Sequence, residues 1–210
     1  MSDKISNNQV TIMGEIISSS SYSHEIFGEG FYMMNVRCKR LSESYDIIPV
    51  MVSERLMDVT ADYTGKLVCV NGQFRSYNRH EAHKNRVVLY VFARETGFID
   101  ELEESPKTNQ IFLDGYICKE PTYRKTPLGR RIADLLLAVN RPYGKSDYIP
   151  CVCWGRDAIY ANNFKLGDRC VIWGRVQSRE YMKKLDEENM EKRVAFEVSV
   201  IKMELAEDGE

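Results

Sequence analysis

The sequence contains no apolar run long enough to cross a membrane, which takes roughly 20 residues in a helix. Residues 1–4 do not show the charged and then apolar pattern of a secretory signal. The chain also lacks a phosphate-binding P-loop and a nucleophile elbow. These absences predict a cytoplasmic protein without catalytic activity. With 43% apolar residues, the chain should be globular and not disordered.

Metal-binding patterns are scarce as well. The six cysteines form no C-x-x-C pair, so we expect no zinc site. Each lies in an apolar, strand-like run, where a free thiol behaves as a small hydrophobic side chain. Of the three histidines, His80 and His83 could share a metal, but no third ligand is evident. We therefore expect neither a metal nor another cofactor.

The net charge of −2 hides an uneven distribution. Residues 1–106 carry 11 basic and 15 acidic side chains, and residues 185–210 carry 3 basic and 9 acidic ones. Residues 107–184 carry 15 basic and 7 acidic side chains, a local net charge of +8. An excess of this size permits a polyanionic partner, although a merely solvated basic surface would give the same count.

Two successive stretches show the same order of expected elements. In the first we expect strands at 10–16, 31–38, 45–52, 67–74 and 87–92, with a short helix at 54–63. In the second we expect strands at 110–117, 131–139, 147–153, 169–177 and 193–203, with a short helix at about 156–164. Residues 98–108 are acidic, contain Pro106 and show little periodicity, so we interpret them as a linker.

The two stretches also match residue by residue, as an internal repeat should. Four landmarks recur at an offset of 101: Asn8-Gln9-Val10, Gly14, Arg40 and Asp46-x-Ile48-Pro49 recur as Asn109-Gln110-Ile111, Gly115, Arg141 and Asp147-x-Ile149-Pro150. Gly65 and Gly72 recur at an offset of 102, as Gly167 and Gly174. We interpret the chain as two tandem copies of one fold.

Five strands with a short helix between the third and the fourth is the order of the OB-fold barrel. We therefore predict an all-β chain of two tandem five-stranded OB-fold barrels, with one short helix per domain. The predicted domains are 1–97 and 109–204, separated by the linker at 98–108 and followed by a short acidic tail at 205–210. Gly115 and Gly174 would absorb the sharp strand bends of a small barrel at low steric cost.

The second copy resembles a known family, the bacterial single-stranded DNA-binding proteins. The features that carry the resemblance span nearly all of residues 109–204: residues 109–115, Glu120-Pro121, Arg124, Thr126-Pro127-x-Gly129, residues 137–141, Cys151-Val152-x-Trp154-Gly155, Gly167 and Gly174-Arg175-Val176-x-Ser178-Arg179. The resemblance implies binding of single-stranded DNA, with bases stacked on aromatic rings and basic side chains along the phosphates.

Carried over by position, the implied stacking residues are Tyr143, Tyr148, Trp154 and Tyr181. Trp154 could instead cap the barrel core, and Tyr148 could be exposed without a role. We interpret Trp173 as a packing or oligomer contact. The candidate phosphate contacts, of which about half should be solvated charges only, are Arg124, Lys125, Arg130, Arg131, Arg141, Lys145, Arg156, Arg175 and Arg179.

The first copy departs from this pattern. Its residues at the four stacking positions are Ser42, Ile47, Ser53 and Arg79, none of them aromatic, although Tyr45 and Tyr77 lie close by in the sequence. We therefore interpret the first copy as a degenerate and mainly structural barrel. By analogy with the family, two chains would form a homodimer with four OB folds. Residues 205–210 are acidic but lack the terminal hydrophobic tip with which the family recruits replication enzymes, so recruitment by that route is not expected.

The main hypothesis is thus sequence-independent binding of single-stranded DNA in replication, recombination or repair, by a cytoplasmic, nucleoid-associated protein without a membrane partner. One alternative is a primosome-like protein-interaction module with weak or vestigial nucleic-acid binding. RNA binding is a third possibility, because barrels of this kind accept both nucleic acids.

Overall fold

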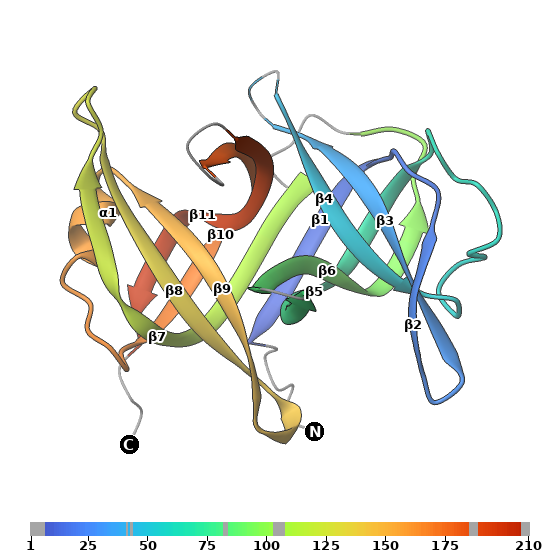
Figure 1. Ribbon diagram of the computed structural model, residues 1–210, viewed down its shortest axis with the longest axis horizontal. Coiled ribbons are helices and arrows are strands. Elements are labelled where there is room, and N and C mark those ends of the chain that lie inside the picture. The colour runs from blue at the N-terminus through green and yellow to red at the C-terminus, as the bar shows by residue number, and fades with distance from the viewer. Residues whose placement is uncertain are drawn as a thin grey trace.

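The structure, a computed structural model, describes residues 7–40, 42, 44–81, 84–102, 108–184 and 189–206, without the side chains of residues 78–86. The chain is dominated by strands, which form two barrels lying side by side (Figure 1). The strands of the first barrel are β1 (Asn8–Ile16), β2 (Ser21–Ile26), β3 (Glu29–Lys39), β4 (Tyr45–Ser53), β5 (Leu67–Glu81) and β6 (Lys84–Phe98). Those of the second are β7 (Asn109–Lys125), β8 (Arg131–Arg141), β9 (Lys145–Trp154), β10 (Arg169–Lys184) and β11 (Met190–Leu205).

Each barrel closes in the same way. In the first, β1 pairs with both β3 and β5, and the circuit is completed by β3–β4, the parallel pair β4–β6, and β5–β6. In the second, β7 pairs with both β8 and β10, and the circuit runs through β8–β9, the parallel pair β9–β11, and β10–β11. Both circuits have the OB-fold strand order, and the prediction of two tandem OB folds is confirmed.

The two barrels share a sheet because β1 and β7 pair with each other at the centre of the molecule (Figure 1). In this antiparallel pair Asn8 faces Leu113, Val10 faces Ile111, and Ile12 faces Asn109. Exchanging each residue for its counterpart 101 positions away turns the Asn8–Leu113 pair into the Asn109–Ile12 pair, so the register is the same for both copies. The barrels are therefore related by an approximate two-fold axis through the Val10–Ile111 pair.

A second set of contacts follows the same two-fold relation. The carboxylate of Asp46 accepts hydrogen bonds from the backbone amide and hydroxyl of Ser178, at 2.7 and 3.2 Å. In the reciprocal contact, Asp147 accepts hydrogen bonds from the amide and hydroxyl of Ser76, at 2.7 and 3.4 Å. Each barrel thus inserts a buried carboxylate against the other, and this contact sets how the two barrels sit.

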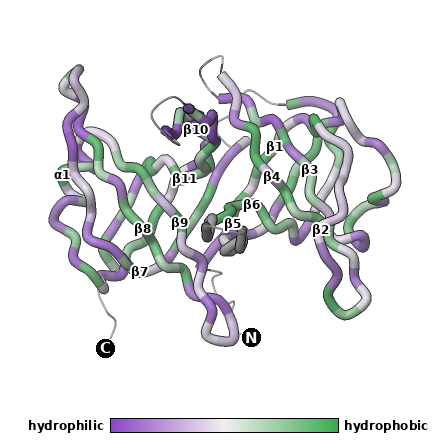
Figure 2. Tube along the Cα trace, in the orientation of Figure 1, coloured by the Kyte–Doolittle hydropathy of each residue, from purple (hydrophilic) through white to green (hydrophobic). Residues whose placement is uncertain are grey.

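The barrel interiors are filled by the apolar side chains that alternate along the strands. In β1 the buried positions include Val10, Ile12 and Ile16, and in β9 they include Ile149, Cys151 and Cys153. This period of two is the one a half-buried strand requires. Hydrophobic positions recur along the strands of both barrels (Figure 2). Among the described residues, no helix is long and apolar enough to cross a membrane.

The predicted helix at 54–63 is wrong. Among the described residues the only α-helix is α1 (Arg156–Ala161), in the second barrel, which is shorter than the predicted 156–164. The carboxylate of Asp58 accepts the Thr60 amide at 3.0 Å, and that of Asp62 accepts the Thr64 amide at 3.0 Å. Aspartates that bond the backbone two residues ahead favour turns over helix.

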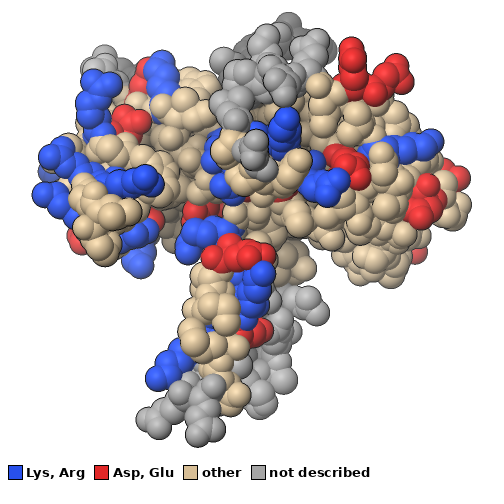
Figure 3. All heavy atoms as spheres, turned by 90° about the horizontal axis from the view of Figure 1, so that it is seen from above, with Lys and Arg blue, Asp and Glu red and all other residues tan. Residues whose placement is uncertain are grey.

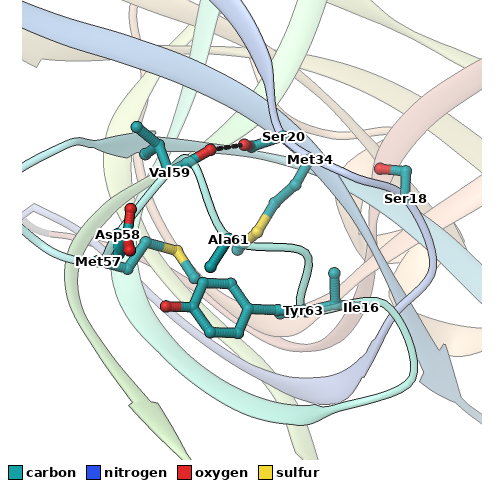
Figure 4. A pocket seen from close by; sticks show the side chains of 9 residues that line it. All are labelled: Ile16, Ser18, Ser20, Met34, Met57, Asp58, Val59, Ala61 and Tyr63. Carbon is teal, nitrogen blue, oxygen red and sulfur yellow. Dashed lines mark hydrogen bonds between the residues drawn. The ribbon is translucent and has the colours of Figure 1, made fainter.

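The apolar side chains that suggested this helix still face the interior. Met57, Val59 and Tyr63 pack against the core of the first barrel and line a small pocket with Ile16 and Met34 (Figure 4). The hydroxyl of Ser20 donates a 2.6 Å hydrogen bond to the Val59 carbonyl and ties the segment to the chain beside it. A turn-rich segment can therefore bury the same stripe as a helix.

Other boundaries also differ from the prediction. Residues 21–26, which lie between the predicted strands at 10–16 and 31–38, form β2, which pairs with β3 in a hairpin. Most of the stretch between the predicted strands at 67–74 and 87–92 belongs to β5 and β6, whose pairing extends to Glu81 and Lys84. Part of the expected linker is ordered against the first barrel, because β6 reaches Phe98 and the Ile99 amide bonds the Leu67 carbonyl.

Candidate nucleic-acid interface

The third strand of the second barrel, β9, presents two of the candidate stacking residues to solvent. Asp147, Ile149, Cys151 and Cys153 point inward and are buried, and the alternate positions point to the other face, where Val152 is also buried. Of these, Tyr148 is 49% exposed and Trp154 is 42% exposed. Trp154 is therefore a surface residue at the end of β9, and the alternative that it caps the core is wrong. Six residues of strand place the two rings about 20 Å apart.

Tyr143 lies in the turn that joins β8 to β9. The turn is a single 3-10 turn, Pro142–Gly144, in which Tyr143 has a positive φ of 66° and is 98% exposed. A bulky residue with positive φ is rare and costs about 1–3 kcal/mol of backbone strain. The turn thus holds an aromatic ring clear of the protein at the tip of a projecting hairpin.

Tyr181 lies on a different hairpin, in the outer part of β10. It is 37% exposed, and the Arg179 guanidinium lies 5.8 Å from the centre of its ring. Its strand neighbour is Arg193 of β11. Together the four aromatic residues follow the β8–β9 and β10–β11 hairpins as separate exposed rings. This arrangement suits a flexible polymer that passes over several rings better than a small ligand in one pocket.

Most of the candidate cations are exposed on the same barrel. The side chain of Arg124 forms an ion pair with Asp134 at 3.0 Å, and that of Arg179 pairs with Glu197 at 3.5 Å; both remain half exposed. The remaining exposed candidates are Lys125, Arg130, Arg131, Lys145 and Arg156. Lys and Arg side chains predominate on the second-barrel lobe, at the left of Figure 3, whereas the other lobe shows both signs.

Two of the predicted phosphate contacts form ion pairs with the buried carboxylates at the junction of the barrels. The Arg175 guanidinium lies 3.2 Å from the buried carboxylate of Asp46, in the other barrel. Arg141 lies 3.3 Å from buried Asp147. The repeat contained the signal for Arg141: its counterpart Arg40, in the copy without stacking residues, binds Asp46 in the same way at 2.9 Å. A residue retained in both copies indicates an architectural role.

The aligned positions of the first barrel offer no aromatic ring. Ile47 is 45% exposed, and Ser53 is buried, with its hydroxyl bonded to Glu29. Ser42 is exposed at the β3–β4 connection, and the side chain of Arg79 lies outside the described residues. The interpretation of this barrel as mainly structural stays a prediction at this point.

The buried thiols of the second barrel favour packing over chemistry. Burial raises the pKa of Cys153 to about 12 and that of Cys170 to about 12. The pKa of Cys151 is raised well above its ordinary value for the same reason. Thiols held in the protonated form are poor nucleophiles and poor metal ligands. No cluster of three or more metal-ligating side chains occurs among the described residues.

Comparison with known proteins agrees with this geometry. Residues 108–205 match the model of the single-strand binding protein family. The curated relatives include single-stranded DNA-binding protein 3 of Listeria innocua, 40% identical over 80 residues, which are 35% of this chain and 50% of that protein. Single-stranded DNA-binding protein 1 of Staphylococcus aureus is 37% identical over 100 residues, 44% of this chain and 56% of that protein. The chain thus spans about half the length of these relatives.

Some solved structures match both barrels at once. The wild-type single-stranded DNA binding protein from Thermus aquaticus superimposes with a TM-score of 0.75, covering 97% of this chain and 94% of that chain. The sequence identity is 19%, so this likeness shows the fold alone. The second barrel is an OB-fold domain whose loops and outer strands carry exposed aromatic and basic side chains. Its residues 108–205 match the single-strand binding protein family, in agreement with the resemblance seen in the sequence.

Proposed function

We propose that the protein binds single-stranded DNA without regard to base sequence, in replication, recombination or repair. The observation that carries this proposal is the exposure of Tyr143, Tyr148, Trp154 and Tyr181 along two hairpins of one basic barrel. Every base has a π-face, so stacking on such rings tolerates any sequence and contributes about 1–3 kcal/mol per base. The family of the second barrel and the names of its relatives support the same function.

Basic side chains add a second, salt-sensitive contribution. Cations near Tyr143 and Trp154, such as Lys145 and Arg156, are placed to meet the phosphates between stacked bases. Neutralising phosphates releases counterions, so affinity should fall steeply as salt rises. The proposed activity is binding alone, and the proposed place of action is the nucleoid in the cytoplasm.

The proposed assembly is a homodimer with four OB folds. On the second barrel, Phe112 of β7 and Trp173 of β10 form an aromatic pair 5.5 Å apart, with Lys202 lying 4.8 Å from the Trp173 ring. The matching positions of the first barrel hold Thr11 and Asn71, which hydrogen-bond to each other at 2.7 Å. This partly exposed apolar pair on the shared sheet supports the interpretation of Trp173 as an oligomer contact.

The proposed function is tested by titrating oligo(dT) into the protein and following tryptophan emission. Stacking on Trp154 should quench its emission, and the apparent affinity should fall with a linear dependence on log salt. Trp154→Phe should lose most of the quenching while retaining most of the binding, because Phe keeps an aromatic face. Trp154→Ala and Tyr181→Ala should each weaken binding by about 1–3 kcal/mol.

Trp173→Phe serves as the matched control for emission, since it removes the other tryptophan and should leave quenching by DNA intact. Absence of binding at low salt would rule out the proposed function. Unchanged affinity in Trp154→Ala and Tyr181→Ala would favour the protein-interaction module instead. Competition between DNA and RNA oligomers of equal length decides between the two nucleic acids.

A further inference from the structure

The first barrel has an aromatic surface of its own on the outer face of β3, β4, β6 and β5. Strand register places Met33 beside Met51, Met51 beside Phe92, and Phe92 beside Gln73 across this face. Phe31, Met51 and Tyr90 form a hydrophobic cluster separate from the barrel core, with Met33 and Phe92 packed against it. The face lies over strands of the OB fold that commonly contact oligonucleotides.

The rings on this face contact one another and reach solvent at two points. Phe31 lies 5.8 Å from Phe92, and Tyr77 lies 5.7 Å from Tyr90 in an edge-to-face arrangement. Tyr77 is 39% exposed, comparable with Tyr181 of the other barrel, and Phe92 is partly exposed. Buried Tyr90 and Phe31 support the two accessible rings from below. The term outer aromatic face is used for Phe31, Tyr77, Tyr90 and Phe92.

The same positions of the second barrel carry different chemistry. The register there pairs Asp134 with Val152 and Val152 with Ser199, so Asp134 and Ser199 occupy the places of Met33 and Phe92. Glu197, beside Gln177, occupies the place of Tyr90. The two faces have therefore diverged, with carboxylates on one where the other has apolar and aromatic side chains.

Two arginines give the outer aromatic face a positive charge. The Arg75 guanidinium lies 3.9 Å from the centre of the Phe92 ring, and that of Arg94 lies 5.5 Å from it. Arg75 donates to the neutral amide of Gln73 at 2.8 Å, and its buried Nε has no hydrogen-bond partner in the structure. Burial, followed by the nearby charge of Arg94, lowers the pKa of Arg75. Arg141 adds to this repulsion, and the carboxylate of Asp147 partly offsets it. A phosphate would relieve the repulsion between Arg75 and Arg94.

We infer that the outer aromatic face is a second contact surface for single-stranded nucleic acid. Tyr77 and Phe92 stack bases, and Arg75 and Arg94 contact phosphates. The inference rests on the proposed function. It gives the first barrel a binding role through residues other than those that align with the four stacking residues of the second barrel. A strand long enough to leave the second barrel would then continue over the first.

The test compares oligo(dT) of two lengths bound to the full chain. An oligomer of about eight nucleotides fits within one OB fold, and one of about 40 nucleotides reaches both barrels. Tyr77→Ala, Phe92→Leu and Arg94→Gln should each weaken binding of the long oligomer by about tenfold, with a much smaller effect on the short one. Phe92→Leu keeps the apolar packing and removes the aromatic face, so it separates stacking from folding.

Salt dependence provides an independent readout. For single strands the slope of log affinity against log salt is roughly −0.7 per phosphate contact, so Arg94→Gln should make the long-oligomer slope less steep by about that amount. Lys66→Gln is the matched control. Its ammonium group also lies 5.5 Å from an aromatic ring, that of Phe98, in the same barrel but on the connection before β5. It should change neither affinity nor slope.

Equal affinity of the Tyr77, Phe92 and Arg94 variants and the unsubstituted protein for the long oligomer would overturn the inference. The proposed function is still supported in that case if Trp154→Ala weakens binding of the same oligomers. If these first-barrel variants lose affinity while Trp154→Ala and Tyr181→Ala do not, the inference holds and the assignment of binding to the second barrel fails.

Discussion

Asp46 and Asp147 occupy equivalent places in the two barrels but are compensated unequally. Asp46 is met by Arg40 from its own barrel and by Arg175 from the other. Asp147 forms an ion pair with Arg141 only, the charge of Arg75 acts on it without an ion pair, and one of its carboxylate oxygens has no hydrogen-bond partner in the structure. Desolvation raises the pKa of Asp147, against the opposing effects of the Ser76 amide and of Arg141. An otherwise symmetric junction thus contains one buried carboxylate whose charge is incompletely compensated.

This carboxylate predicts a pH dependence of stability. Because its pKa is higher in the folded than in the unfolded chain, the folded state binds more protons between the two values, and stability falls as pH rises through that interval. The interval begins near the unfolded pKa of about 3.9 and extends above it. Asp147→Asn should therefore gain stability relative to the unsubstituted protein as pH rises, measured by urea unfolding across the acidic range.

At each pH, the free energy of unfolding of the unsubstituted protein is subtracted from that of Asp147→Asn. The contributions of the other carboxylates are the same in both proteins and cancel. Any constant offset from the altered hydrogen bonds to Ser76 and Arg141 does not change with pH. A difference in unfolding free energy that is flat over the acidic range would show that Asp147 titrates normally.

Glycines on the barrel strands are required by close backbone approach. A Cβ on Gly72 of β5 would meet the carbonyl oxygen of Phe92, and one on Gly174 of β10 would meet that of Ser199. Gly115 of β7 shows the same restriction, because a Cβ added there would lie 2.6 Å from the carbonyl oxygen of Ala138. The sequence predicts a sharp bend at Gly115 and Gly174, and the structure adds a neighbouring strand whose carbonyl leaves no room for a side chain.

Gly72→Ala and Gly174→Ala should each destabilise the protein by about 1–3 kcal/mol or more, because a rigid backbone atom must move to admit the methyl group. Gly97→Ala is the matched control. It also lies in a strand of the first barrel, β6, but nothing lies within 4 Å of its added Cβ. Its unfolding free energy should stay within about 0.5 kcal/mol of the original. Equal effects at all three positions would refute the explanation by close approach.

At the scale of the whole molecule, the two barrels form one unit. They share the β1–β7 pairing, and the reciprocal bonds of Asp46 to Ser178 and Asp147 to Ser76 hold them on the other side. These contacts are largely buried, and breaking them would expose carboxylates and backbone amides that lose their partners. Neither barrel is expected to unfold before the other.

Cooperative unfolding can be measured because both tryptophans, Trp154 and Trp173, lie in the second barrel. Tryptophan emission reports that barrel alone, whereas far-UV circular dichroism reports both. The urea midpoints of the two signals should coincide. Asp46→Ala removes the carboxylate that pairs with Arg175. It should lower the free energy of unfolding by about 3–5 kcal/mol, and both urea midpoints should fall together. Separate midpoints would indicate independent barrels.

Local patterns in the sequence were enough for several features. Constant offsets between landmarks such as Asp46 and Asp147 identified the repeat, and the period of two along the predicted strand at 147–153 agrees with buried Ile149 and exposed Tyr148. The helix at 54–63 failed because apolar spacing cannot separate a helix from turns stabilised by aspartate. The roles of Arg141 and Arg175 were missed because their partners are buried carboxylates at a junction between the barrels.

The sequence by itself determined the tandem OB folds and the family resemblance of the second barrel, because strand periodicity and motif spacing are local properties of the chain. Only the tertiary structure decided which charges are compensated and which rings lie together. Arg75 and Phe92 are distant in sequence, and they meet because β5 pairs with β6 in a particular register. Alignment of the copies compared equivalent positions, and of the outer aromatic face it pointed only to Tyr77, as a neighbour of an aligned position.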